Sequence, residues 1–566
     1  MTLQKQPIHR CPRRRPSYGL LHLPVLMALT SGALAQTPDA NDQVLARWQQ
    51  QGGQAGTLNA QGVVEFRGSA SVDLYHQDVD VDSGNPTTLS GLRPGNHQRT
   101  SVQFDLRHTI PDQRITYLQG GVVNSDDLAL QPRFATQITT LQAGIAGVGY
   151  RLALGDVAVN FSNLGTNLGI RGLWGDWQHK DFGLTYYAGA VGESWEALTG
   201  QRPRQGGPSN LQPLRDVMGI KADYRFSPAL QGFATLQRYE DRRGDLQEAA
   251  LFNGHAGSLG LRYADQTSQA YLEWARSERE PSQGPGGSQQ ANALQVGVSH
   301  RLGKHLLRGG YNDIRPGFHS LVQMAAPGVK EWYAGADWTL TPQLAWSVDA
   351  RDALSRQQLA GALTRTELRT LGNRLTYRFA DVDGLSLTLA DLRNRNEDAS
   401  GKATPSSSTQ ATLGYARDGW SAQGVLGYGE TRAPTGKTKQ QQWQASLGRS
   451  FAWPGDTSLS LQGSLGQTET RYSTAASAQR QDAAAVNVGY THPGYGQWNL
   501  GSHWQRLVGG AGVNDLASTS LTLDWALPLG QAATLKSYLR LSNRNRGDAT
   551  RHVEEQTAGV QLSYLW

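Results

Sequence analysis

The last ten residues of the chain, TAGVQLSYLW at positions 557–566, decide its fold. Apolar or aromatic residues occupy every second position, namely Ala558, Val560, Leu562, Tyr564 and Trp566. Small or polar residues stand between them, and Leu565 is the single departure. This period of two is typical of a β-strand with one apolar face and one hydrated face. A strand of a soluble β-sandwich shows the same period, so the rest of the chain must discriminate.

The same alternation recurs along the chain. Even positions from Val64 to Leu74 are mostly apolar and odd positions are polar, and Val102, Phe104 and Leu106 repeat the pattern. Short Gly, Pro or Asp turns such as 111–113 and 418–419 separate such segments. Longer polar connections lie between these turns, at 76–99, 192–214, 240–253, 278–290, 353–365, 395–408, 432–440, 471–480 and 546–556.

Short turns at one end and long connections at the other predict an all-β fold, a large transmembrane antiparallel up-and-down β-barrel over residues 63–566. We expect roughly 26 strands, an even number within the range of such barrels, with both termini on the periplasmic side. Composition agrees with this prediction. Hydrophobic residues make up only 38%, yet the chain has 66 Gly, 15 Trp and 20 Tyr, and a barrel needs apolar residues only on its outer face.

The C-terminal pattern Val560-x-Leu562-x-Tyr564-x-Trp566 resembles the end of Gram-negative outer-membrane β-barrel proteins. The resemblance implies that the last strand closes the barrel and is read by the outer-membrane insertion machinery. It also implies contact with outer-membrane lipid.

The first 35 residues have the features of a cleaved secretory signal peptide. Five basic residues precede a mostly apolar run, and Ala33-Leu34-Ala35 fits a cleavage site. The only cysteine, Cys11, lies in this leader, and the leader also accounts for most of the net charge of +6. We therefore expect no disulfide and no nucleic-acid partner. Residues 36–62 form a periplasmic lead-in, where 41–50 is either a frayed tail or a short docking or plug helix.

Alternation also predicts which charged side chains line the lumen. This set contains both signs of charge and comprises Arg67, Asp105, Arg107, Asp349, Arg351, Arg374, Arg378, Lys536 and Arg540. A solvated barrel wall would contain the same residues, so none of them is singled out as a specific site.

The width of the predicted barrel directs the functional hypotheses. Barrels of about 16–18 strands already enclose an aqueous channel, and barrels of about 22 strands carry a plug. Since strands begin near residue 62, we expect inward-folded loops such as 192–214, a periplasmic or lumen-filling partner protein, or a transiting polymer to fill the lumen. The sequence thus predicts a conduit for a polymer, surface protein or other large cargo. The alternatives are a structural sheath or anchor for a partner complex, and a small-solute diffusion porin.

Two further segments invite specific interpretations. Residues 154–162 and 170–173, with Gly155-Asp156, Phe161 and Arg171-Gly172, are faintly similar to fimbrial ushers, which implies surface export. A pair of strands eased by glycine, with a bulge, explains the same residues. The motif Asp78-x-Asp80-x-Asp82-Ser83-Gly84 suggests either a loose Ca²⁺ contact or a solvated acidic loop, because its glycine is one position late for an EF-hand.

No catalytic motif stands out. The 13 His show no paired metal-ligand spacing, and neither a G-x-S-x-G motif nor a P-loop is present. We expect a protein that is not an enzyme and that needs no cofactor or metal.

Overall fold

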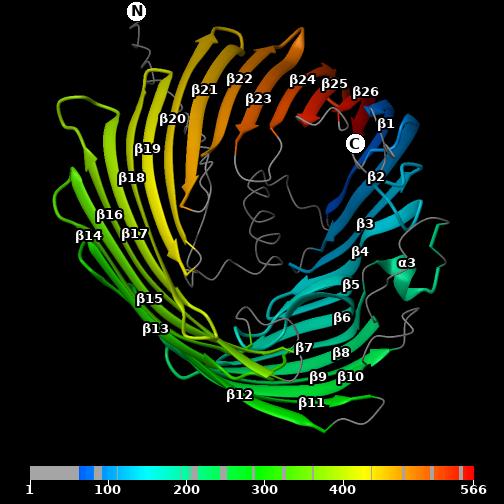
Figure 1. The fold of residues 1–566 in the computed structure, drawn as a ribbon. Helices are drawn as coiled ribbons and strands as arrows, with labels where there is room; N and C mark the ends of the chain where they lie inside the picture. The colour runs from blue at the N-terminus through cyan, green and yellow to red at the C-terminus, as the bar shows by residue number, and fades with distance from the viewer. Residues whose placement is uncertain are drawn as a thin grey trace, which may run out of the picture.

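The computed structural model is a closed antiparallel β-barrel (Figure 1). Over the described residues the sheet has 26 strands, each hydrogen-bonded to the next, and β26 pairs with β1. The predicted fold class and strand number are confirmed. The structure describes residues 63–81, 92–110, 113–192, 194–201, 203–204, 214–242, 251–282, 287–320, 327–359, 362–434, 436–473, 478–509, 515–546 and 552–566. The predicted signal peptide and the 41–50 segment lie outside these residues.

The first half of the barrel contains β1 (Val63–Val81), β2 (Gly95–Thr109), β3 (Ile115–Ser125), β4 (Thr136–Gly147), β5 (Tyr150–Asn160), β6 (Asn167–His179), β7 (Phe182–Val191), β8 (Leu214–Arg225), β9 (Leu230–Arg242), β10 (Phe252–Ala264), β11 (Ser268–Pro281), β12 (Gln289–Leu302) and β13 (His305–Ile314). A single turn of helix, α3 (Trp195–Leu198), lies between β7 and β8.

The second half contains β14 (Val329–Thr339), β15 (Leu344–Leu359), β16 (Ala362–Arg378), β17 (Leu385–Glu397), β18 (Ala403–Arg417), β19 (Trp420–Ala433), β20 (Gly436–Trp453), β21 (Thr457–Tyr472), β22 (Gln479–His492), β23 (Gly496–Val508), β24 (Leu516–Leu529), β25 (Ala533–Arg546) and β26 (His552–Leu565). Among the residues that the structure describes, no helix is long and apolar enough to cross a membrane.

The two ends of the barrel differ. Links such as 418–419 and 303–304 join each even-numbered strand to the next at the turn end, where β1 begins and β26 ends. Longer links such as 192–213 lie at the opposite, loop end. Two predicted loops are wrong: 353–365 and 432–440 belong to long hairpins whose pairing continues almost to their tips. Charged residues such as Arg356, Arg365 and Lys437 stand on the outward face of these hairpin ends, so polarity in the sequence did not distinguish strand from loop.

The outward face of the barrel is defined by exposed apolar side chains. Leu426 is 65% exposed, Leu465 57% and Val486 55%, and the strand registers place them on the same side of the sheet. Aromatic pairs lie towards the turn end, for example Trp338 with Trp346, whose ring centroids are 4.7 Å apart. The opposite, lumenal face therefore follows from the register of each strand.

Closure of the barrel depends on the C-terminal segment, residues 557–566. Residues 553–565 of β26 pair antiparallel with 69–81 of β1. Beyond β26, the backbone of Trp566 exchanges two hydrogen bonds of 3.0 Å with the backbone of Gly68. The Trp566 ring covers Gly68, where a Cβ would clash with it. Val560, Leu562, Tyr564 and Trp566 are all exposed, and the register puts the first three on the outward face.

Candidate functional site: the lumenal wall

The charged residues predicted to line the lumen all lie on the face opposite the exposed apolar side chains. Arg67 and Asp105 are register partners, and Arg107 pairs with Asp105 at 2.9 Å. The set as placed by the registers is Arg67, Asp105, Arg107, Asp349, Arg351, Arg374, Arg378, Lys536 and Arg540. These residues do not converge on one site, because they are spread over β1, β2, β15, β16 and β25.

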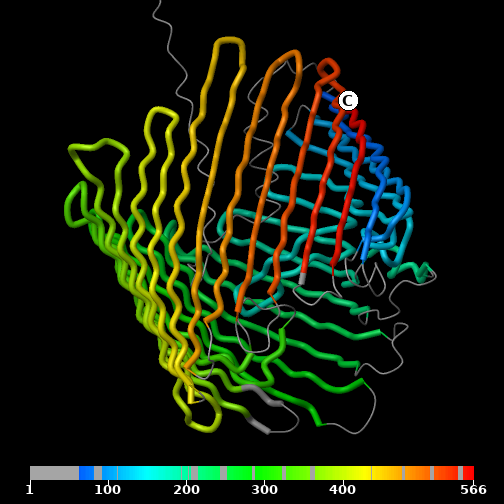
Figure 2. Tube along the Cα trace, turned by 45° about the horizontal axis from the view of Figure 1, so that its top comes forward, coloured from blue at the N-terminus to red at the C-terminus, as the bar shows by residue number. Residues whose placement is uncertain are grey.

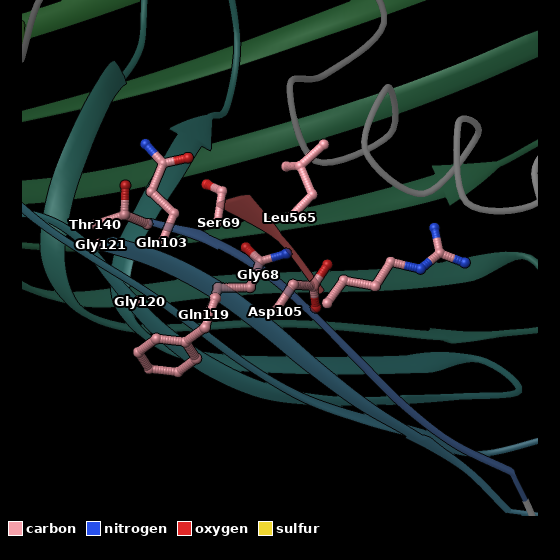
Figure 3. A pocket seen from close by; sticks show the side chains of 11 residues that line it. Gly68, Ser69, Gln103, Asp105, Gln119, Gly120, Gly121, Thr140 and Leu565 are labelled. Atoms are coloured by element: carbon pink, nitrogen blue, oxygen red, sulfur yellow. The ribbon is translucent and has the colours of Figure 1, made fainter. Parts of the chain in front are cut away.

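Two of these residues line a hollow in the wall between β1 and β4 (Figure 3). Its volume is about 370 Å³, and its lining includes Arg67, Asp105, Gln103 and Gln119. Gly68 of β1 and Gly120 and Gly121 of β3 also line it. The hollow is a shallow feature of the wall and not an enclosed pocket.

Lys536 and Arg540 lie beside the closing strands. Tyr538 lies between them on β25, and its hydroxyl donates to a carboxylate oxygen of Asp73 on β1 at 3.0 Å. Because β26 lies between β25 and β1, this hydrogen bond crosses over β26. The Arg540 guanidinium lies 5.2 Å from the centroid of the Tyr538 ring. These contacts join β25 to the first strand, β1, on the lumenal side.

A large sector of the lumenal wall, from β5 to β15, is crosslinked by ion pairs. Arg308 bridges Asp337 at 2.8 Å and Asp349 at 2.6 Å, and Arg351 pairs with Glu331. Further pairs in this sector are Arg151–Asp176, Arg215–Asp241 and Lys221–Asp223. Positive and negative side chains are matched, so this sector carries little net charge of either sign.

The link between β5 and β6, residues 161–166, folds inward onto this sector. Phe161 and Leu164 are each 1% exposed and pack in apolar clusters against the wall. Thr166 bonds to Tyr187 at 2.6 Å and to Gln237. The link therefore extends from β5 along the lumenal wall and contacts β7, β9 and β11.

Glu273 on β11 is the main polar anchor of this inward link. Its carboxylate is fully buried and accepts from the Ser162 hydroxyl at 2.6 Å, from the Leu164 amide at 3.2 Å and from the Tyr271 hydroxyl. A buried carboxylate with three donors is stably held because its charge is compensated by hydrogen bonds. Alternation could have assigned Glu273 to the lumenal face, but nothing in the sequence pointed to the residues that bind it.

A second inward segment, residues 315–320 after β13, joins the first. Phe318 is fully buried, the His319 amide donates to Ser277 at 2.9 Å, and the Ser320 hydroxyl donates to the backbone of Gly165 at 3.4 Å. Burial, and then the guanidinium groups of Arg279 and Arg215, lower the pKa of His319 to about 4. Loops 161–166 and 315–320 therefore both fold inward, and each supports the other.

The 192–214 loop, expected to fold inward, lies elsewhere in its described part. The Trp195 indole donates to Asp156 at 2.8 Å, and Asp156 pairs with Arg171 on the outward face of β5 and β6. Figure 1 shows α3 outside the ring beside β4 and β5. The expectation is wrong for these residues because the helix covers an exposed strand edge instead.

That edge arises where β4 and β5 separate. They pair only between 142–147 and 150–155, so the loop-end half of β4 lacks this partner. Glu196 of α3 accepts from the Ile138 amide at 2.7 Å, and Asp156 accepts from the Leu141 amide at 2.6 Å. Two carboxylates thus satisfy backbone donors that a neighbouring strand would otherwise bind.

The segment with usher similarity forms the β5–β6 pair beside this gap. Gly155 has a φ of +113°, and a Cβ there would clash with the backbone oxygen of Leu141. A Cβ added at its register partner Gly172 would likewise clash with the Cα of Gly189 in β7. The glycine-eased strand pair therefore explains these residues by their local geometry.

The sector from β17 to β23 has a different lumenal face. Every Asp, Glu, Lys and Arg of these seven strands lies on the outward face, and the titratable lumenal side chains among them are Tyr472 and His503. The lumenal positions are mainly Ser, Thr, Gln, Asn and Gly, and the exposed amides among them are Asn396, Gln410, Gln423, Gln440, Gln442, Gln444, Gln462, Asn487, Gln497 and Asn499. We call this surface the neutral sector. Figure 1 shows it along the upper left of the ring, with β5 to β11 along the lower right and bottom.

The described residues also bear on metal and catalytic sites. They contain no cluster of three or more His, Cys, Asp or Glu that could hold a metal. Asp78 and Asp80 of the acidic motif belong to β1, and the rest of that motif lies outside the described residues. Ser268 lies 2.9 Å from His300, but the pair is exposed beside a turn on the outward face.

The sequence matches no known protein-family profile and no curated protein. Among solved structures, the chain is similar to the siderophore receptor PirA from Pseudomonas aeruginosa, with 9% identity, a TM-score of 0.40, and coverage of 89% of this chain and 81% of PirA. It is also similar to the ferric citrate transporter FecA, with 10% identity, a TM-score of 0.37, and coverage of 90% and 80%. Pseudomonas aeruginosa OccK5 (OpdH) matches at 13% identity and a TM-score of 0.31, covering 65% of this chain and 98% of OccK5. At these values the matches describe barrels of the same general kind and carry no information about cargo.

Proposed function

We propose that this protein is an outer-membrane β-barrel of a Gram-negative bacterium and acts as a conduit for a large, hydrated cargo. The exposed apolar band on the outward face supports a lipid environment, because an aqueous solvent would leave this surface uncovered. Aromatic pairs at the turn end fit a membrane interface. Each strand of the closed sheet pairs with two neighbours, and where β4 and β5 separate the carboxylates of Glu196 and Asp156 accept from the free amides of β4, as a lipid environment requires of backbone groups.

The observation that carries the conduit function is the one-sided filling of a very wide lumen. Barrels of about 16–18 strands already enclose a water-filled channel, and here 26 strands close the ring. The inward links 161–166 and 315–320 pack against β5 to β13, whereas the neutral sector keeps its lumenal amides exposed. A path bordered by polar side chains therefore runs beside the neutral sector.

Signal-peptide-dependent secretion and recognition of β26 by the insertion machinery are part of this proposal. A partner protein in the periplasm or lumen also belongs to it, as the component that delivers or restrains cargo. The lumenal side chains of the neutral sector bear on whether the cargo is a polymer or a surface protein.

Polymer exclusion in planar lipid bilayers tests the conduit. Polyethylene glycols of increasing size are added while the current through the purified barrel is recorded. We expect polymers too large for ordinary diffusion porins to enter and reduce the current. Exclusion of all but the smallest polymers would contradict a conduit and favour a small-solute porin. A stoichiometric partner that stays in the lumen during purification and blocks every polymer would instead identify a structural sheath.

A further inference from the structure

The neutral sector has a chemistry that the conduit function alone does not require. We propose that it is a binding surface for an uncharged, hydroxyl-rich polymer, namely a neutral polysaccharide chain. This inference rests on the proposed conduit and names the class of cargo that the conduit would carry.

The distribution of charge gives the first argument. A hydrated wall tolerates charged side chains at little free-energy cost, and the sector from β5 to β15 contains many of them. On β17 to β23 charged residues do occur, but they lie on the outward face, such as Asp391, Glu430 and Lys439. Since hydration alone permits charges on a lumenal wall, their absence from this one needs a separate cause.

The relief of the wall gives the second argument. Lumenal glutamines of β20 stand opposite glycines on the adjoining strands: Gln442 faces Gly427, and Gln444 faces Gly466. A Cβ added at Gly427 would come within 2.6 Å of the Gln442 side chain, so the amide lies over the glycine. This pairing of long and absent side chains makes a low, even surface along which an extended chain can lie.

The hydrogen-bonding groups give the third argument. Amide and hydroxyl side chains both donate and accept, as sugar hydroxyls do. Across the described part of the barrel, no hydrogen bond to another side chain is recorded for the amides of Gln423, Gln444 or Gln462, and all three are exposed. Bonds of this kind exchange readily with water, so many weak contacts can hold a chain while it moves.

The same features disfavour other cargo. A polyanion would be bound best by unpaired Arg or Lys side chains, and the neutral sector has none on its lumenal face. A folded protein would be bound best by complementary charges and by several Trp, Tyr or Arg anchors, and the lumenal positions of these strands contain no Trp or Arg and a single Tyr, Tyr472 at the loop end of β21.

Single-barrel current recording with the full chain tests this inference. The probes are a linear neutral glucan, polyethylene glycol of equal hydrodynamic radius, and polygalacturonate. The double variant Gln442→Met and Gln444→Met keeps side-chain length but removes the amide groups. Its matched control is Gln103→Met and Gln119→Met, which changes two lumenal amides of β2 and β3 outside the neutral sector.

We expect the glucan to block the current for longer than polyethylene glycol does. The Gln442/Gln444 variant should shorten the dwell time of the glucan about fivefold or more, because it lacks two hydrogen-bonding groups. The control variant should leave the glucan dwell time unchanged. If polyethylene glycol enters but the glucan dwells no longer than it does, the inference is overturned while the conduit stands. Preferred blocking by polygalacturonate, or equal effects of the two double variants, also overturns it. Exclusion of every polymer instead refutes the conduit.

Discussion

Glu273 provides the sharpest test of the inward link at 161–166. Replacing it with alanine removes the acceptor of three donors, the Ser162 hydroxyl, the Leu164 amide and the Tyr271 hydroxyl. Leaving a buried donor unsatisfied costs about 1–3 kcal/mol. We take the low end for each, because the vacated polar space beside the lumen can admit water.

The summed effect is about 3 kcal/mol, which raises the population of the undocked link about 100-fold. The apolar anchors Phe161 and Leu164 still favour docking, since burying each contributes about 1.5–3 kcal/mol. Glu273→Ala should therefore leave the barrel intact but let the link open far more often.

Cysteine labelling measures this opening. The only natural cysteine, Cys11, lies in the predicted signal peptide, so Asn163→Cys introduces a single reporter into the link. We expect a bulky maleimide to react at least tenfold faster with this cysteine when Glu273 is alanine, because the labelling rate follows the open population. Glu331→Ala is the matched control, since Glu331 is another partly buried lumenal carboxylate but binds Arg351 and Asn312 instead of the link. A labelling rate unchanged by Glu273→Ala would refute the anchoring role.

Three further outcomes follow from other parts of the wall. Gly155→Ala should lower the temperature at which the folded barrel unfolds in gel-shift assays, because of its φ of +113° and its closeness to the β4 backbone, whereas Gly169→Ala should be neutral since no atom lies within 4 Å of its added Cβ. Lowering the pH from 7 to 5 should speed labelling of a Pro316→Cys variant, because the pKa of His319 is about 4 in the docked loop and 6.5 in the free loop. The undocked loop therefore binds the proton preferentially, and docking is unaffected well above pH 6.5. His319→Phe should remove this pH dependence of the labelling rate. Glu196→Ala should make the 192–213 link more susceptible to limited proteolysis, since it leaves an edge amide of β4 unpaired.

The sequence was most informative where one physical rule applied along the whole chain. Alternation with a period of two revealed the strands and the lumenal side of residues such as Arg374 and Lys536, because a closed sheet has only two faces. It failed at the hairpin tips 353–365 and 432–440, where charged residues such as Arg356, Arg365 and Lys437 interrupt the apolar alternation of the outward face.

Inward folding of the links was a different problem. Contacts between Ser162 and Glu273 join residues that are distant in sequence, and alternation contains no information about them. Two apolar residues, Phe161 and Leu164, in so short a polar link are the one local signal that it packs against something. The outward course of α3 depends on the gap between β4 and β5, which no local pattern indicated.

The two lumenal sectors have opposite requirements, and this explains why they are kept apart. The inward links are held by a buried carboxylate beside matched ion pairs, and a charged cargo touching those groups would compete for them. A cargo that travels along β17 to β23 meets mainly exchangeable amides and hydroxyls and no lumenal Asp, Glu, Lys or Arg, so it can bind and leave without disturbing the links. Substitutions in the charged sector should therefore change the open cross-section, whereas substitutions in the neutral sector should change how long a cargo dwells. Measuring the open cross-section and the dwell time on Glu273→Ala and on the Gln442/Gln444 variant separates the roles of the two sectors. A variant of either sector that altered both quantities equally would show that the lumen acts as one undivided surface.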